Sequence, residues 1–433
     1  MSSSMVNLTS SSDNNKNCTS SHDEHHHEQI EFICSETVDS AVNLSLSPET
    51  FLEAAIALKE QVVEATWTEL CAGGGEIMDS TVYTGLLGTA FTCLRFYEAT
   101  GSQQDLHLCA DIVHACADAV AYSSTRYMTF LCGRGGIYAL GAVIANHCGD
   151  RHKLNFYLTE FLELAQEKAL PAGPEEGGLG MSYDLLHGRA GFLWASLFIN
   201  KHIGQETVPS DLLNPIVKAV LAGGRAGASD HATCPLMYRW HGTRYWGAAH
   251  GLAGILHVLL HFPLTDEDAE DVKKTLRYMM STRFPHTGNY PSSEGNPRDN
   301  LVQWSHGAGG MAITLCKASQ VFPHDREFRD AAIEAGEVVW KSGLVDKPGL
   351  ADGASGNAYV FLSLYRLTGD AIYEDRAKAF GGFLYQNSRN LITNTNSNGL
   401  DYAFSLFQGL AGVACLCSDL VKPENSKFPG FEL

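Results

Sequence analysis

The sequence lacks strongly apolar runs of membrane-spanning length, although 45% of its 433 residues are apolar. Its longest stretch without a charged residue, Tyr245–Thr265, has 21 residues but contains three histidines, three glycines and a proline. A membrane-spanning helix needs about 20 strongly apolar residues. The mean hydropathy is −0.09. The apolar runs therefore fit buried core helices, and we expect no transmembrane span.

Positive charge is also scarce, since 30 Lys and Arg face 49 Asp and Glu, for a net charge of −19. Nucleic acids and anionic membranes bind basic surfaces, so we expect no nucleic-acid partner. The 12 cysteines form no Cys-x-x-Cys pair, and the chain does not open on an apolar signal segment. We expect reduced thiols in a cytoplasmic protein, with peripheral membrane or nuclear locations as alternatives.

Residues 1–46 lack any hydrophobic period and are rich in Ser, Asn, His and Glu. This composition is typical of a disordered tail. We expect such a tail over residues 1–46 and one domain over residues 47–433. The run His25-His26-His27 lies in the tail, where a solvated run is expected rather than a metal site.

What the chain has in abundance is the pair Gly-x-x-Gly, which opens seven apolar runs of helical period. The pairs are Gly85/Gly88, Gly133/Gly136, Gly188/Gly191, Gly251/Gly254, Gly307/Gly310, Gly353/Gly356 and Gly409/Gly412. Successive first glycines are 48, 55, 63, 56, 46 and 56 residues apart. A period near 50 indicates a repeat architecture. Small residues on one helix face let backbones approach, and packing alone accounts for most of the pairs.

A longer amphipathic helix is predicted before each Gly-x-x-Gly helix, because charged and apolar residues alternate there at helical spacing. These helices are predicted over Phe51–Thr68, Leu106–Tyr122, Lys153–Lys168, Asp211–Ala222, Asp266–Thr282, Glu327–Lys341 and Ala371–Gln386. Ser47, Ser210 and Thr265 are predicted to cap helix starts. Seven buried and seven amphipathic helices predict an all-α fold, an α/α toroid with an inner and an outer ring. An open superhelix is the alternative, but no capping repeats are evident.

The residue before each first glycine occupies the same place in every repeat. These residues are Thr84, Cys132, His187, His250, His306, Asp352 and Gln408. In a toroid they line one mouth of the ring, where the inner-helix N-termini favour anionic ligands and thiolates. A general base, a metal ligand and a carbonyl polariser are all open roles for the three histidines. The long loops Pro171–Gly180, Gly223–Gly242 and Phe284–Asn300 are also expected to be functional.

These motifs resemble the LanC-like proteins, the eukaryotic relatives of bacterial lanthionine cyclases, from about residue 50 to residue 420. The matching segments are Tyr83–Ala90, Leu131–Gly136, Leu186–Gly191, Gly247–Gly254, Trp304–Gly310, Leu350–Asn357, Phe404–Gly412, Gly288–Pro291 and Arg298-Asp299. The chain looks most like the plant branch, whose members were once proposed as G-protein-coupled receptors. The lengths of the apolar runs do not support a seven-span receptor, and this hypothesis ranks last.

The resemblance implies the α/α toroid and a zinc-dependent activation of a thiol, which then adds to a dehydrated amino acid. The family's zinc ligands are two cysteines and a histidine. At those positions this sequence has Ser305, Ala351 and Asp352. Because all three ligands are replaced, we expect no zinc and no other cofactor. A makeshift site of His306 and Asp352 would lack thiolates and bind zinc weakly.

Other family positions are retained. The resemblance implies that His250 is a general acid/base and that Asp184 assists protonation. It places Arg298 and Lys347 near the region that contacts glutathione. Together with His306, these two residues are the candidate ligand-binding residues. Structural roles are the alternatives: Asp184 caps an inner helix and Arg298 pairs with an acidic loop.

We therefore expect a LanC-like pseudoenzyme that binds a peptide, a glutathione-like molecule or another small anionic ligand. A role in signalling, with a protein partner, belongs to this hypothesis. The alternative is an enzyme that resembles the family's glutathione transferases and adds thiols to dehydroamino acids, with a remodelled zinc site or none.

Overall fold

The computed structural model describes residues 46–120, 127–170, 182–395 and 402–433. All but the last residue of the predicted disordered tail, with its His25–His27 run, lies outside the described residues, as does the predicted loop Pro171–Gly180. Everything below concerns the described part of the chain.

Seven inner helices begin at the Gly-x-x-Gly pairs, as the sequence predicts. They are α4 (Leu86–Thr100), α6 (Arg134–His147), α8 (Arg189–His202), α10 (Leu252–Leu259), α12 (Ala308–Val321), α14 (Ala354–Thr368) and α16 (Leu410–Asp419). The first glycine of each pair is the N-cap residue of its helix. The first turns of these helices are buried almost all round, which explains their uniformly apolar sequences.

Seven amphipathic helices form the outer layer. They are α2 (Pro48–Val63), α5 (Gln103–Val120), α7 (Arg151–Leu164), α9 (Ser210–Gly227), α11 (Asp266–Ser281), α13 (Glu327–Ser342) and α15 (Ala371–Thr395). A short helix α3 (Glu69–Gly73) follows α2 after a π-helical turn. The predicted caps Ser47 and Thr265 accept backbone N–H bonds at 3.2 Å. Ser210 is instead the first residue of α9, which Pro209 precedes as the N-cap.

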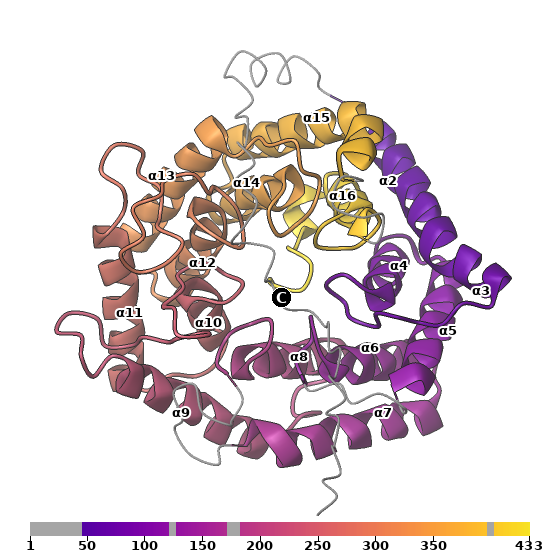
Figure 1. Ribbon diagram of the computed structural model, residues 1–433, viewed down its shortest axis with the longest axis horizontal. Coiled ribbons are helices and arrows are strands. Elements are labelled where there is room, and N and C mark those ends of the chain that lie inside the picture. Colours follow the sequence, from indigo (N-terminus) through magenta and orange to yellow (C-terminus); the bar gives the residue numbers. More distant parts are fainter. Residues whose placement is uncertain (1–45, 121–126, 171–181, 396–401) are drawn as a thin grey trace, which may run out of the picture. The chain divides into compact units, whose positions relative to one another are not determined.

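The helices close into two concentric rings (Figure 1). Each of the inner helices α4, α6, α12 and α14 packs on the outer helix that follows it in the sequence. The N-terminal outer helix α2 packs on the C-terminal inner helix α16, and α16 also contacts α4. These contacts join the two ends of the repeat array. The fold is therefore the closed α/α toroid, and the open superhelix is excluded.

The second glycine of each pair lies against the turn that precedes its own helix. A Cβ atom there would lie 1.9 Å (Gly356) to 2.7 Å (Gly88) from the carbonyl oxygen six residues earlier, in all seven repeats. Real Cβ atoms essentially never come within 3.0 Å of such an atom. The predicted packing role is thus refined: the closest backbone is the repeat's own turn. Neighbouring repeats contribute side chains, such as Leu406 beside Gly88.

The C-terminal segment turns inward and occupies the centre of the ring (Figure 1). Phe428 and Phe431 are completely buried there. The Phe431 ring stacks on His257 at a centroid distance of 3.9 Å, and its carbonyl oxygen accepts a 2.8 Å hydrogen bond from Trp194 Nε1. The sequence reasoning did not predict this segment, because two isolated aromatic residues at a chain end have no periodicity.

In the described ranges, none of the helices combines the length and the apolar character that crossing a membrane requires.

Candidate functional site

The turns that precede the inner helices are joined by backbone hydrogen bonds around one mouth of the ring. Ser305 N–H donates to Ala351 O at 2.9 Å, Ala351 N–H to Phe407 O at 2.9 Å, and Phe407 N–H to Tyr83 O at 3.1 Å. Tyr83 N–H in turn donates to Leu131 O at 3.0 Å. This belt holds the residues before the first glycines at one end of the ring, where the inner helices begin.

The third and fourth turns are joined differently. Within the described residues no backbone hydrogen bond links them, and their connection is a side-chain pair. His250 Nδ1 lies 3.0 Å from Asp184 Oδ2. The same carboxylate accepts from Ser182 Oγ at 2.6 Å and from His187 N–H at 3.1 Å. Asp184 thus fixes its own turn and also holds a histidine of the next repeat. It does not cap the inner helix, because the N-cap of α8 is Gly188 without a side-chain cap bond.

Asp184 is a buried carboxylate, with 2% of its side chain exposed. Burial alone would raise its pKa, but the contacts of the His187 and His250 side chains outweigh burial and hold the pKa of Asp184 below its usual value. An ionised carboxylate only accepts hydrogen bonds, so His250 donates through Nδ1. This tautomer leaves Nε2 of a neutral His250 as a proton acceptor, which is the arrangement of a positioned general base.

A stack of flat rings covers this pair. The Trp240 ring lies on the His250 ring at a centroid distance of 3.8 Å and an interplanar angle of 11°. The His187 ring also stacks on the His250 ring, at a centroid distance of 5.4 Å and an interplanar angle of 8°. Trp240 lies within the predicted functional loop Gly223–Gly242, but nothing in the sequence singled it out. The stack restricts ring rotation and gives the mouth a planar wall.

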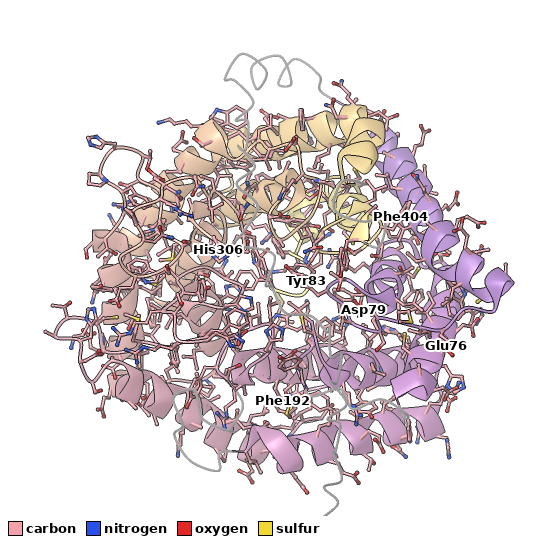
Figure 2. All side chains as sticks on the ribbon, viewed as in Figure 1. Glu76, Asp79, Tyr83, Phe192, His306 and Phe404 are labelled. Carbon is pink, nitrogen blue, oxygen red and sulfur yellow. The ribbon has the colours of Figure 1, made fainter. Side chains whose placement is uncertain are left out.

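His306 lies on the inner side of the ring (Figure 2). Tyr245 lies between the two histidines, 6.1 Å from the His250 ring and 5.9 Å from the His306 ring. Nδ1 of His306 is buried and has no hydrogen-bond partner among the described residues. Burial, and then the nearby His250, lower the pKa of His306 to about 4. His306 is therefore neutral at physiological pH and is available as a donor or an acceptor.

The other two predicted residues, Lys347 and Arg298, lie in loops. Lys347 Nζ forms an ion pair with Asp352 Oδ2 at 3.0 Å, on the partly exposed rim. Arg298 is exposed, and its backbone N–H donates to Asn296 Oδ1. In the described ranges the Arg298 side chain makes no ion pair with an acidic loop and no contact with His250 or His306.

Asn289 is a residue whose importance the sequence did not reveal. Its amide nitrogen donates to Asp299 Oδ1 at 3.0 Å and to Leu301 O at 2.9 Å. Its amide oxygen accepts from Ala308 N–H at 2.9 Å, at the start of α12. Asn289 therefore connects two of the sequence motifs and fixes the turn that carries His306. Its signal in the sequence was its place within the segment Gly288–Pro291.

The three positions of the family's zinc ligands lie close together, since Ser305 N–H bonds to Ala351 O and Asp352 is the next residue. The groups present do not fit zinc. The Ser305 hydroxyl donates to Gln303 Oε1 at 3.3 Å, and Ala351 offers only a methyl group. The Asp352 carboxylate is paired with Lys347. No thiolate is available at any of the three positions, and thiolates are the ligands that give such a site its affinity.

The described residues contain two groups of three potential metal ligands, and neither includes His306 or Asp352. One is Asp184 with His187 and His250, whose ligand atoms lie within 4.8 Å of one another. Here Asp184 Oδ2 already accepts hydrogen bonds from the His187 backbone and from His250. Both ring nitrogens of His187, however, are buried and lack a hydrogen-bond partner among the described residues.

The chain matches the family model described as lanthionine synthetase C-like protein over residues 76–433. It is 64% identical over 409 residues to the LanC-like protein GCL1 of Arabidopsis thaliana, and the alignment covers 94% of each chain. It is 34% identical over 364 residues to the Danio rerio protein named glutathione S-transferase LANCL1, covering 82% of this chain and 85% of the relative.

Among solved structures, nisin cyclase superposes with a TM-score of 0.61, covering 86% of this chain and 94% of its own. The sequence identity is 16%, so this similarity shows the shared toroid alone. The family model spans most of the chain, and both relatives align over more than four fifths of it. The chain belongs to the lanthionine synthetase C-like family.

Proposed function

We propose that this protein binds a peptide or a small anionic ligand of the glutathione type at the mouth of the ring, and does not catalyse zinc-dependent thiol addition. The observation that carries the proposal is a contrast within one mouth. The pair of Asp184 and His250 is buried and held by several contacts. The adjoining positions Ser305, Ala351 and Asp352 offer no zinc-binding thiolate.

Four properties of the mouth favour a small ligand with polar and anionic groups. The inner helices direct the positive ends of their dipoles to this end of the ring, although the first N–H group of each helix already donates within the protein. His306 has a buried ring nitrogen without a partner among the described residues, ready to bond a polar ligand atom. The Trp240 ring, stacked on His250, adds a flat apolar wall. Lys347 on the rim contributes positive charge, although Asp352 partly neutralises it.

The absence of thiolate ligands removes the means of activating a thiol. A free thiol has a pKa near 8.5, and a bound metal is what deprotonates it outright. With a hydroxyl, a methyl group and a lysine-paired carboxylate in place of the ligands, the mouth retains surfaces for recognition without the metal. We propose that such binding serves a signalling role, in which the liganded ring is recognised by a protein partner.

Calorimetric titration with reduced glutathione and with S-methylglutathione tests the binding proposal. Both are expected to bind, because recognition rests on the carboxylates and not on the thiol. His306→Gln should weaken binding at least about tenfold, the equivalent of one hydrogen bond to a charged group. The matched control is His231→Gln, since His231 pairs with Glu294 at 3.0 Å outside the mouth. If neither compound binds, or if both variants bind alike, the proposal is wrong.

The second candidate is a metal-independent addition of glutathione to a dehydroamino acid, and the hydrogen bond between His250 and Asp184 favours it. In this reaction His250 Nε2 takes the thiol proton, and the sulfur forms a bond to Cβ of the dehydroalanine. The imidazolium then returns the proton to Cα. The relative named glutathione S-transferase supports this candidate.

Mass spectrometry of a dehydroalanine peptide incubated with glutathione and the protein separates the two candidates. Our proposal predicts adduct formation at the uncatalysed rate. An accelerated rate that is lost in Asp184→Asn and kept in His231→Gln would establish the enzyme instead.

A further inference from the structure

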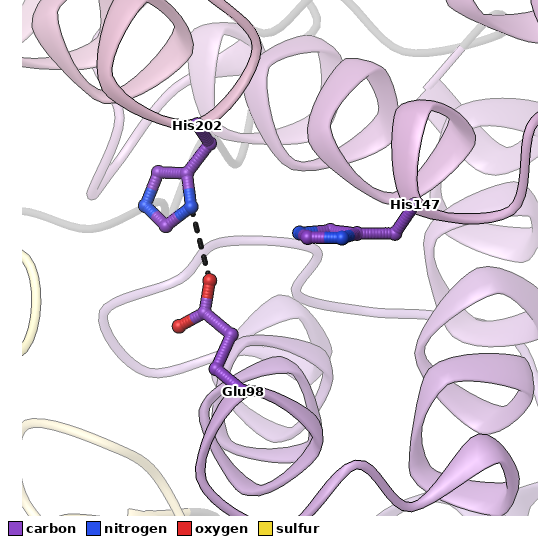
Figure 3. Close-up of side chains that lie close together, drawn as sticks. All are labelled: Glu98, His147 and His202. Atoms are coloured by element: carbon purple, nitrogen blue, oxygen red, sulfur yellow. Dashed lines mark ion pairs between the residues drawn. The ribbon is translucent and has the colours of Figure 1, made fainter.

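Three potential metal ligands meet at the opposite end of the inner helices, away from the mouth. Glu98, His147 and His202 lie in the last turn of α4, α6 and α8, respectively (Figure 3). His147 and His202 each follow the first glycine of their repeat by 14 residues, and Glu98 follows Gly85 by 13. Consecutive repeats therefore present one ligand each at an equivalent place, and ring closure brings the three together.

The geometry of the cluster suits a small divalent cation. His202 Nδ1 lies 3.0 Å from Glu98 Oε1, and the three ligand atoms lie within 4.8 Å of one another. Ligands of tetrahedral zinc at 2.0–2.2 Å are about 3.3 Å apart. Small side-chain rotations are enough to place all three around one ion. The His202 side chain is 15% exposed and that of Glu98 33%, so the cluster is sheltered and still reachable from solvent.

The hydrogen bonding of the cluster is incomplete without an ion. Nε2 of His147 is buried and lacks a hydrogen-bond partner among the described residues. Glu98 lies at the C-terminal end of α4, where the helix dipole disfavours an acidic side chain and favours a cation. The helix dipoles of α6 and α8 add to the same negative potential, because both helices also end here.

Two cationic side chains act on Glu98 and must be considered as alternatives to a metal. Arg95 is already engaged, since its Nη2 lies 2.6 Å from Asp419 Oδ2. Lys201 is attracted by the charge of Glu98, but burial and the repulsion of Lys427 lower the pKa of Lys201. Neither forms an ion pair with Glu98 in the described part of the chain. The carboxylate therefore retains its capacity to bind a metal.

We propose that Glu98, His147 and His202 form a Zn²⁺ site at this end of the ring, with a fourth position for water or a ligand. A donor set of two imidazoles and one carboxylate favours zinc over magnesium or calcium. Helix α8 is 14 residues long, so the site is about 20 Å from the mouth. The bound ion crosslinks three consecutive inner helices. It is independent of the family's thiol chemistry, which belongs to the mouth.

Zinc titration of the full-length protein tests the site, and the parent chain must first lose its competing ligands. These are the tail histidine run, the two tail cysteines and the exposed thiols, removed by His25→Ala, His26→Ala, His27→Ala, Cys18→Ser, Cys34→Ser, Cys71→Ser and Cys148→Ser. The parent is expected to bind about one Zn²⁺ per chain and to melt at a higher temperature with zinc than with a chelator. Zinc binding should weaken by more than about 100-fold in each of the variants Glu98→Gln, His147→Gln and His202→Gln. This exceeds the loss of about 10- to 100-fold that follows when a hydrogen-bond partner of a metal ligand is removed.

Two control variants distinguish this site from others. His114→Gln removes an exposed histidine whose Nε2 lies 3.7 Å from Asp118 Oδ2, and should leave zinc affinity unchanged. Asp184→Asn disrupts the other group of three ligands at the mouth. If zinc uptake is lost in Asp184→Asn and retained in Glu98→Gln, the proposal is wrong.

A cysteine variant guards against loss of binding through misfolding. His147→Cys keeps a ligand at the same place, so it should bind Co²⁺ and develop thiolate-to-cobalt charge-transfer absorption that the parent lacks. If the folded His147→Cys protein shows no such band, or if the three Gln variants bind zinc like the parent, the three side chains do not form a metal site.

Discussion

The C-terminal segment is predicted to stabilise the ring from its centre, and Phe431→Ala is the substitution that tests this. Phe431 is fully buried, and its ring contacts His257, Trp304 and Phe428 at centroid distances of 3.9, 5.4 and 5.8 Å. Alanine removes the phenyl group and leaves a cavity, which the closely packed helices of the toroid cannot easily fill.

The expected loss of unfolding free energy is about 3–5 kcal/mol, the range for removing a buried phenylalanine ring. Three aromatic contacts, each contributing about 0.5–1.5 kcal/mol beyond burial, place the effect in the upper half of that range. The hydrogen bond of Trp194 to the backbone of residue 431 is unaffected by the substitution. Since natural domains are stable by only about 5–15 kcal/mol, the loss should be readily measurable.

Urea unfolding followed by both circular dichroism and tryptophan fluorescence measures this effect, provided that the two transitions coincide. The matched control is Phe156→Ala, because the Phe156 side chain on α7 is 49% exposed. The control should lose about 1 kcal/mol or less. A Phe431→Ala protein no less stable than the control would refute the placement of the C-terminal segment in the ring.

Three further predictions concern the turns and the buried histidines. The combined substitutions Ser305→Cys, Ala351→Cys and Asp352→His should add about one Zn²⁺ per chain by metal analysis; a folded variant without added zinc would show that the positions do not converge. Gly247→Ala would put a Cβ 1.7 Å from the Ser305 carbonyl oxygen and should cost about 1–3 kcal/mol in urea unfolding. The control Gly73→Ala has no atom within 4 Å of its Cβ and should not destabilise. Burial, and then Lys317 and Lys427, lower the pKa of His257 to about 3, so only the unfolded chain, with a pKa near 6.5, takes up this proton between pH 6.5 and pH 3. The free energy of unfolding therefore falls as the pH drops below 6.5, by about 2 kcal/mol between pH 7 and pH 5. His257→Gln should flatten this dependence when urea unfolding is measured at the two pH values.

The sequence predicted the inner helices and two of the helix caps because the contacts behind both are local. The glycine pairs marked the inner helices correctly because each glycine is needed by a contact within six residues of itself. The caps at Ser47 and Thr265 are local for the same reason, since each hydroxyl bonds three residues ahead. The predicted cap at Ser210 is wrong, because Pro209 adopts the extended conformation of the N-cap residue and Ser210 is the first residue of α9.

The candidate site was predictable only in part. His250 and His306 were found because they occupy equivalent places in successive repeats. Their partners were not all found, since Trp240 comes from a long loop without periodicity and packs on His250 through tertiary contacts. The roles of Arg298 and Lys347 in ligand binding stay predictions. The contacts of Arg298 with Asn296 and of Lys347 with Asp352 are not revealed by sequence spacing.

The sequence by itself determined the helical repeat, its number of units and the end of each unit at which polar groups gather. These features depend on which residues stand next to one another along the chain. Only the tertiary structure decided that Asp184 meets His250, 66 residues away, that Glu98, His147 and His202 share one place, and that the C-terminal aromatic residues fill the ring. Such contacts arise when the ring closes, because the packing of all fourteen helices sets the distance between residues in different repeats.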